Sequence, residues 1–182
     1  MTPALRFAVA AASLSMLVGC GDVFGTKDAH HPGTDLGSFQ VTATLTSSTC
    51  GEGALGAGST WEFEVQLARG DSALFWNNGA EVITGALDED RQSFSFQSAV
   101  EVDMRTEEDL GKPPCAVRRD DNASGVLDSA DDPVHGFTGT LGYAFSPTED
   151  SECSDLLPPS EAPVFAALPC SMAYAVEGEH TE

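Results

Sequence analysis

Positively charged side chains are scarce in this sequence. Lys and Arg together number 8, against 29 Asp and Glu, which gives a formal net charge of -21 at pH 7. So few cations cannot neutralise a row of phosphates, and the chain is repelled by nucleic acid and by anionic membrane surfaces. The charge balance therefore excludes nucleic acid as a partner. Hydrophobic residues still make up 41% of the 182 residues, which is enough for the packed core of a single domain.

The motifs that carry common metal and enzyme chemistry are also missing. The sequence has no Cys-x-x-Cys pair, which argues against a zinc site and against thioredoxin-type redox chemistry. It has no Gly-x-Ser-x-Gly turn, which presents the nucleophile in α/β-hydrolases. With 29 acids, a carboxylate-based hydrolase remains an alternative, although no pair of acids stands out. The sequence therefore predicts no catalytic residues.

Long hydrophobic runs are absent. The most apolar stretch, residues 7–18, has 12 residues, whereas a membrane-spanning helix needs about 20. Arg6 precedes this stretch and the tetrapeptide Leu17-Val18-Gly19-Cys20 ends it, in the order expected of an export signal. The tetrapeptide resembles the lipobox of bacterial lipoproteins. This resemblance implies that Cys20 carries a diacylglyceryl group and that residues 1–19 are removed as a signal peptide; a secretory signal with an incidental cysteine, or an uncleaved anchor, is the alternative.

The segment after the signal has the composition of a tether. Residues 20–37 include four Gly and one Pro and show no hydrophobic period, which is typical of a flexible linker. Residues 38–182 are then the folded domain. We expect the mature protein to be held on a bacterial membrane by its lipid anchor, facing the periplasm or lying at the cell surface.

Four cysteines remain in the predicted domain: Cys50, Cys115, Cys153 and Cys170. An even number of cysteines in an exported chain predicts two disulfides and an oxidising compartment. Of the three possible pairings we favour Cys153 with Cys170, because the proline-rich segment between them needs a covalent restraint. This choice leaves Cys50 paired with Cys115.

Helical periodicity is missing, and the domain alternates instead between apolar and polar residues. One face of a strand is predicted by Phe39, Val41, Ala43 and Leu45, and others by the sets 61–67, 94–104, 137–145 and 172–176. Asn78-Gly79 between two apolar runs predicts a β-hairpin, because both residues tolerate a positive φ. The pattern predicts an all-β domain of about seven to nine antiparallel strands, either a sandwich or an up-and-down barrel.

One acidic segment carries a candidate metal site. From Asp120 to Asp131, oxygen-bearing side chains alternate and a glycine occupies the sixth position, which resembles a calcium-binding EF-hand loop. The resemblance implies these calcium ligands: Asp120, Asn122, Ser124, Val126 through its carbonyl, Asp128 and Asp131. Ser124 and Asp131 depart from the usual residues, and the flanks look like strands rather than helices. The alternative is an acidic hairpin loop without an ion.

Two neighbouring aromatic residues, Phe75 and Trp76, form a candidate ligand platform. In a strand one of them faces outward, where it can stack on a sugar or on a partner protein. The most economical interpretation is a lipid-anchored binding or interaction module with an unidentified protein or carbohydrate partner. Two alternatives stay open: a calcium-assisted or carboxylate-based hydrolase, and a β-barrel carrier of a small apolar ligand.

Overall fold

The structure is a computed structural model that describes residues 33–56, 58–106, 109, 111–161 and 163–181. The predicted signal peptide, the lipobox with Cys20 and the tether up to residue 32 lie outside the described residues. Within the described part, no helix is long and apolar enough to cross a membrane.

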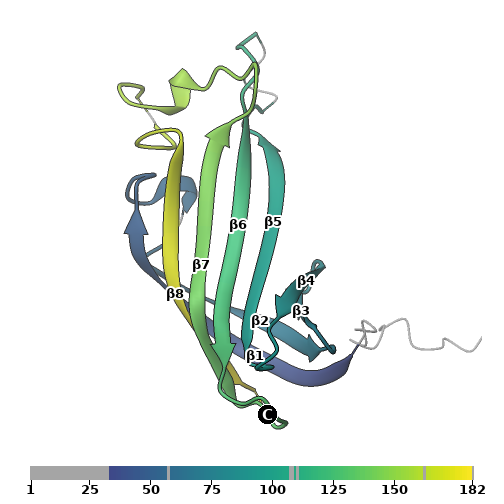
Figure 1. The fold of residues 1–182 in the computed structure, drawn as a ribbon. Helices are drawn as coiled ribbons and strands as arrows, with labels where there is room; N and C mark the ends of the chain where they lie inside the picture. Colours follow the sequence, from purple (N-terminus) through teal and green to yellow (C-terminus); the bar gives the residue numbers. More distant parts are fainter. Residues whose placement is uncertain (1–32, 57, 107–108, 110, 162, 182) are drawn as a thin grey trace, which may run out of the picture. The chain divides into compact units, whose positions relative to one another are not determined.

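The domain is an all-β, up-and-down barrel, which is one of the two architectures that the sequence predicts (Figure 1). Each strand pairs antiparallel with its neighbour in sequence, and β1 also pairs with β8, which closes the barrel. The eight strands are β1 (Thr34–Ser48), β2 (Thr60–Arg69), β3 (Ala73–Asn77), β4 (Val82–Leu87), β5 (Ser93–Asp103), β6 (Ala116–Leu127), β7 (Gly136–Pro147) and β8 (Cys170–His180). Two short 3-10 turns, η1 (Ala54–Gly56) and η3 (Ser154–Leu156), lie in the connections.

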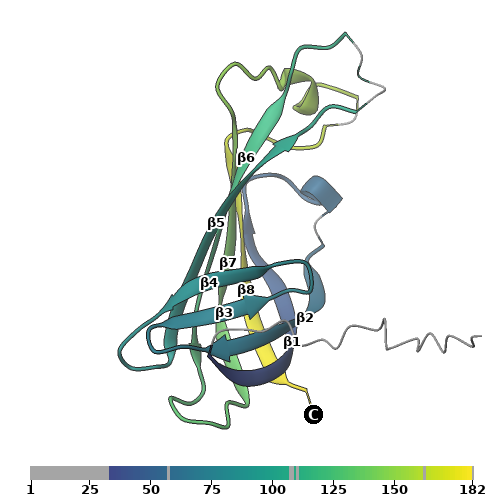
Figure 2. The ribbon, with the colours of Figure 1, turned by 90° about the vertical axis from the view of Figure 1, so that its right-hand side faces the viewer.

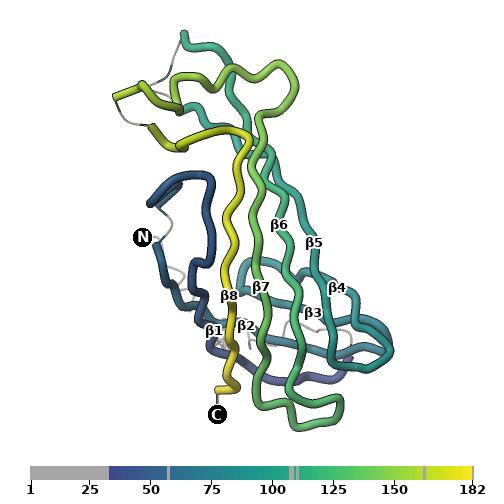
Figure 3. Tube along the Cα trace, turned by 60° about the vertical axis from the view of Figure 1, so that its left-hand side comes forward, coloured from purple at the N-terminus to yellow at the C-terminus, as the bar shows by residue number. Residues whose placement is uncertain are grey.

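The strands have unequal lengths, and this inequality opens one side of the barrel. Strands β3 and β4 have 5 and 6 residues, whereas β5 to β8 have 11 or 12. Strand β4 pairs with β5 only at Ala86–Ser95 and Leu87–Phe94. Figures 2 and 3 show β3 and β4 beside one end of the β5–β8 sheet only. Beyond that end, β5 pairs with β6 alone among the described strands.

The inward side chains of the strands form one core, which also includes the cysteines and Phe165 at the disulfide end. Phe39, Val41 and Ala43 of β1 are fully buried, as the alternation of apolar residues predicts. The inward residues of β6 and β7 follow the same period of two, because successive side chains of a strand point to opposite faces. The core includes Leu67, Leu74, Phe94, Phe96, Leu127, Phe137, Tyr174 and Val176.

The predicted turns follow from their residues. Between β3 and β4, Gly79 has a φ of 86°, and the side-chain oxygen of Asn78 accepts the backbone N–H groups of Ala80 and Glu81 at 2.9 and 3.0 Å. This confirms the hairpin. Between β4 and β5, the Asp90 carboxylate accepts hydrogen bonds from the hydroxyl of Ser93 and from two backbone N–H groups, and these bonds lower its pKa.

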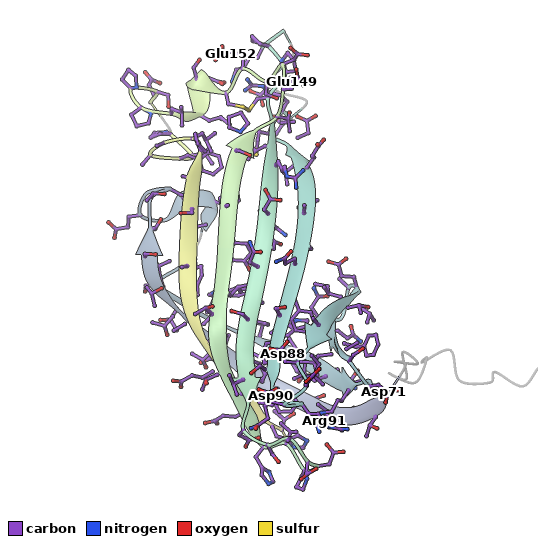
Figure 4. The ribbon with its side chains drawn as sticks, in the orientation of Figure 1. Asp71, Asp88, Asp90, Arg91, Glu149 and Glu152 are labelled. Atoms are coloured by element: carbon purple, nitrogen blue, oxygen red, sulfur yellow. A yellow bond between two sulfur atoms is a disulfide. The ribbon has the colours of Figure 1, made fainter. Side chains whose placement is uncertain are left out.

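The acids of the turns lie at opposite ends of the long sheet. Figure 4 shows Asp88 and Asp90 at the β4–β5 turn, and Glu149 and Glu152 at the far end beyond β7. The turns therefore carry charge into solvent at both ends of the sheet, as expected for residues that keep an acidic domain soluble.

The disulfide pairing that we favoured is wrong. The bonds join Cys50 to Cys170 and Cys115 to Cys153. Barrel closure explains the first bond, because Ser48 at the end of β1 lies opposite Met172 at the start of β8. Pairing of β6 with β7 explains the second: Val117 lies opposite Pro147, and the connection after β7 returns to the start of β6, where Glu152 N–H donates to the Pro114 carbonyl at 2.9 Å.

The boundary between tether and domain also needs a correction. Residues 34–37, which we assigned to the tether, are the first residues of β1, and Asp35 lies opposite Ala68 of β2. Leu36 is buried in the core. The alternation of apolar and polar residues does not predict this part of β1, because Gly37 interrupts it. The pairing of β1 with β2 shifts register at the same place, between Asp35 and Gly37.

A buried arginine holds the connection between β6 and β7 to the closed end of the barrel. The Arg69 side chain is 1% exposed. Its Nη1 donates to the carbonyl of Ala130 at 2.6 Å, and its Nη2 donates to the carbonyl of Ser129 at 3.1 Å. A longer contact of 3.4 Å joins Nη1 to the Asp132 carboxylate, which is half exposed. The guanidinium is thus held mainly by backbone carbonyls.

We expect Arg69→Met to lower the free energy of unfolding by about 2–4 kcal/mol, because it leaves two partly buried carbonyls without their donor. The matched control is Arg118→Met, whose exposed side chain pairs with Asp120 on the surface. Its loss should change the free energy of unfolding much less, because exposed ion pairs contribute little to stability. Urea unfolding of both variants measures the difference. Equal losses would contradict the role assigned to Arg69.

Candidate functional site

The open side of the barrel leads into a hollow of about 400 Å³. Its walls come from six strands, β2 to β7, so the hollow is the part of the barrel interior that the core does not fill. The lining includes Trp61, Phe63, Trp76, Ile83, Phe96, Arg119, Asp121 and Tyr143. Phe96 is buried and the other side chains are partly exposed, with Trp61 at 37%.

Stacked aromatic rings form one wall of this hollow. The rings of Trp61 and Phe63 are stacked, with centroids 4.4 Å apart and planes 22° apart. Trp76 continues the series, 6.2 Å from Phe63 and 5.6 Å from Phe96. Such ring pairs add about 0.5–1.5 kcal/mol each beyond their buried area, so they hold the wall in a fixed shape.

A second hollow of about 330 Å³ adjoins the first, and Trp61, Arg119 and Tyr143 line both. Tyr174 and Met172 of β8 and Leu55 of η1 complete it. Because the two hollows share three side chains, we treat them as one site and call it the aromatic groove. Its exposed rim includes Leu55, at 48%, and Trp61.

An ion pair lies in the wall of the aromatic groove. Arg119 and Asp121 stand two residues apart on the inward face of β6. Nε and Nη2 of Arg119 each donate to one carboxylate oxygen of Asp121, both at 2.7 Å. The Arg119 and Asp121 side chains are 39% and 18% exposed. The hydrogen bonds to Asp121 raise the pKa of Arg119, and the pair carries no net charge.

Tyr143 connects the ion pair to the aromatic wall. The Arg119 guanidinium carbon lies 5.6 Å from the centre of the Tyr143 ring, within cation–π range. Tyr143 also contacts Tyr174 edge to face, with centroids 6.2 Å apart. Burial raises the pKa of Tyr143 to about 12, and burial raises the pKa of Tyr174 as well. Both phenols are therefore neutral at physiological pH and offer the groove an uncharged polar group.

The segment predicted to bind calcium is not a loop. Residues 120–127 belong to strand β6, paired with β5 on one side and β7 on the other. Asp120, Asn122, Ser124 and Val126 share its outward face, whereas Asp128 and Asp131 lie beyond its end. Asp120 is occupied by Arg118 through three hydrogen bonds of 2.7–3.0 Å. The expected loop conformation is therefore wrong, because an alternation of period two is equally the outward face of a strand.

No other grouping replaces this metal site: within the described residues, no three His, Cys, Asp or Glu side chains are placed to hold one metal ion. The two members of the predicted ligand platform also separate. Trp76 faces the hollow, whereas Phe75 faces the opposite side of β3 and lies opposite Ala68 in the pairing with β2. Only Trp76 belongs to the aromatic groove.

Sequence reasoning missed Arg119, Asp121 and Tyr143 as members of a site. A signal for them exists. Both charged residues fall in phase with the buried Val117 and Leu127 of the same strand. Charged side chains on the inward face of a barrel strand are rare unless they have a partner or a function. Two such residues on one strand therefore indicate a polar site in the barrel interior.

Comparisons of the chain with protein-family models, with curated proteins and with solved structures find no match.

The two tyrosines of the chain provide a test of the groove's burial. In an unfolded chain both phenols ionise near pH 10, but the folded protein should release their protons only at higher pH, with Tyr143 near pH 12. The unfolded state then loses protons first, so stability falls as pH rises from about 10 towards 12. An ultraviolet titration of the phenolate band, compared with Tyr143→Phe, measures this. Ionisation of both phenols at the unfolded value would contradict the geometry.

Proposed function

We propose that the protein is a binding protein of the bacterial cell envelope, held by a lipid on Cys20, whose aromatic groove takes up a small ligand with a flat or aliphatic apolar body. The observation that carries the proposal is the stacked aromatic wall of a barrel interior that stays open beside the short β3–β4 hairpin. This proposal combines two of the functions considered from the sequence, a binding module and a β-barrel carrier of a small apolar ligand.

The groove has the size and the walls of a ligand site. Small-molecule sites are typically hollows of about 300–1,000 Å³ with apolar walls and a few placed polar groups, and the larger hollow here measures about 400 Å³. Its aromatic side chains come from hydrogen-bonded strands, so they are positioned before a ligand arrives. Each Å² of apolar surface removed from water contributes roughly 25 cal/mol, and a partly exposed Trp61 leaves such surface available.

The charges of the site select against anionic ligands. Asp121 neutralises Arg119, Glu81 also lines the hollow, and the chain as a whole carries -21. An anion therefore meets repulsion from the protein and no uncompensated cation in the wall. The Arg119–Asp121 pair and the neutral Tyr143 phenol can still exchange hydrogen bonds with an uncharged polar group. We infer a neutral or cationic ligand.

The envelope location rests on two features that agree with each other. The lipobox Leu17-Val18-Gly19-Cys20 predicts export and lipidation. The two disulfides fit an oxidising compartment, which an exported protein reaches. The hydrolase alternative finds no support in Asp121, because Arg119 holds both of its carboxylate oxygens.

A neutral apolar dye tests the groove directly. N-phenylnaphthylamine should bind with a rise in dye fluorescence, and Trp61→Ala should weaken its binding about tenfold, which corresponds to about 1.4 kcal/mol. The matched control is Phe75→Ala, which removes an aromatic ring from the opposite face of β3 and should leave the affinity unchanged. The anionic dye anilinonaphthalene sulfonate should bind more weakly than the neutral dye. Equal effects of the two substitutions would place the dye elsewhere.

Metabolic labelling tests the anchor. Radioactive palmitate should enter the protein in its bacterial host, and Cys20→Ala should abolish the label and release the protein from the membrane fraction. Cys50→Ala is unsuitable as a control because it breaks a disulfide, so Ser15→Ala, within the signal, serves instead and should retain the label. Label that survives Cys20→Ala would refute the lipid anchor.

A further inference from the structure

The free edge of β5 is a second feature that the barrel opening creates. From Gln97 to Asp103, β5 pairs with β6 along its full length, whereas β4 pairs with β5 only at Phe94 and Ser95. Every residue of this seven-residue segment is exposed. No described strand covers its other side.

The hydrogen bonds at the two ends of β5 show which backbone groups face the open side. Met104 N–H donates to the Cys115 carbonyl at 2.9 Å, and Leu127 N–H donates to the Gln92 carbonyl at 3.0 Å. Even-numbered residues of β5 therefore bond with β6, because hydrogen-bonded pairs alternate along an antiparallel ladder. The N–H and C=O groups of Gln97, Ala99 and Glu101 point away from β6. The Asp88 N–H bond to the Ser93 carbonyl, at 2.8 Å, confirms that odd-numbered residues face the β4 side.

Apart from the charges of Glu101 and Asp103, this edge lacks the features that normally block strand addition. Natural edge strands are protected by Pro, by Lys, by bulges or by a covering loop. The segment Gln97–Asp103 contains no Pro and no Lys, and its register with β6 has no shift. Two inward-phase residues beyond the hollow, Val100 and Val102, are 43% and 39% exposed. An incoming strand would cover apolar surface and satisfy the backbone groups at once.

The charges along the edge define the partner. Glu101 and Asp103 stand on the outward face, and the nearby Arg118 is already held by Asp120. Like charges opposite one another destabilise a strand pair, so a second copy of this acidic chain is a poor match. A strand with Lys or Arg on one face and apolar residues on the other is a good match.

We propose that the β5 edge from Gln97 to Glu101 accepts an extended segment of another protein by strand addition, with basic side chains facing Glu101 and Asp103 and apolar side chains facing Val100 and Val102. Main-chain hydrogen bonds provide the affinity and the alternating side chains provide the specificity, as in other strand-addition complexes. This interaction uses the backbone edge of β5 rather than the aromatic wall, and its first residue, Gln97, also lines the larger hollow of the groove.

The test uses a blocked peptide of alternating Lys and Val as the probe. Calorimetry should detect binding to the protein, and NMR should show slowed hydrogen exchange of the Ala99 and Glu101 amides on addition of the peptide. A peptide of alternating Glu and Val should bind at least tenfold more weakly. A Lys–Val peptide that is N-methylated at alternate residues should lose binding, because it cannot form the ladder.

Two substitutions at one position isolate the backbone contact. Ala99→Pro removes an N–H that the β5–β6 ladder does not use, and Pro is tolerated at such edge positions; it should weaken binding of the Lys–Val peptide about tenfold. Ala99→Val keeps the N–H and should bind as the wild type does. Matching thermal unfolding midpoints of the two variants confirm that both are folded.

Several results would overturn the proposal. One is the absence of any heat with the Lys–Val peptide at millimolar concentration, and another is equal binding by Ala99→Pro and Ala99→Val. Slow exchange of the Ala99 and Glu101 amides in the free protein would show that another part of this chain already covers the edge. Self-association that Ala99→Pro abolishes would assign the edge to a second copy instead.

Discussion

Closure of the barrel by two short strands is the constraint on which the other features of this domain depend. Six long strands need a partner on each side to satisfy their backbone groups, and β3 and β4 supply one over a short length only. At that end the interior is packed with Phe39, Leu67 and Leu74. Beyond it the sheet continues without its closing strands, so the inward faces of β6, β7 and β8 border a groove together with aromatic residues of β2, β3 and β5. The same break gives β5 a free edge.

The surface and the interior groove of the domain carry different kinds of side chain. Many acids stand in turns, as Figure 4 shows for Asp88, Asp90, Glu149 and Glu152. The groove holds mainly aromatic rings and one neutral ion pair, with Glu81 also in its lining. The surface charge keeps the molecule soluble and repels anions. The groove offers apolar area with a few hydrogen-bonding groups. Together these properties suit a neutral or cationic apolar ligand, and the predicted anchor would keep the binding site at a membrane.

The sequence pattern predicts the local structure of this protein well and its closure poorly. Alternation identifies the strands and the inward faces because each strand must bury one side, and Asn78-Gly79 marks a real hairpin. Pairing of β1 with β8 joins residues more than 120 positions apart, so the Cys50–Cys170 bond cannot be predicted from the local sequence. The same period of two made the outward residues Asp120, Asn122 and Ser124 look like loop ligands. Nothing local shows that β3 and β4 stop short, and the groove exists only because they do.

Native mass spectrometry of the protein, extracted in mild detergent from the membrane of its own host, tests the central claim that the open barrel interior holds a ligand. We expect a population heavier than the covalent protein by the mass of a small neutral or cationic molecule. That added mass should be lost on mild collisional activation and absent from Trp61→Ala. The barrel interior is not a ligand site if the wild-type protein carries only its covalent mass under all conditions, or if the added mass persists unchanged in Trp61→Ala.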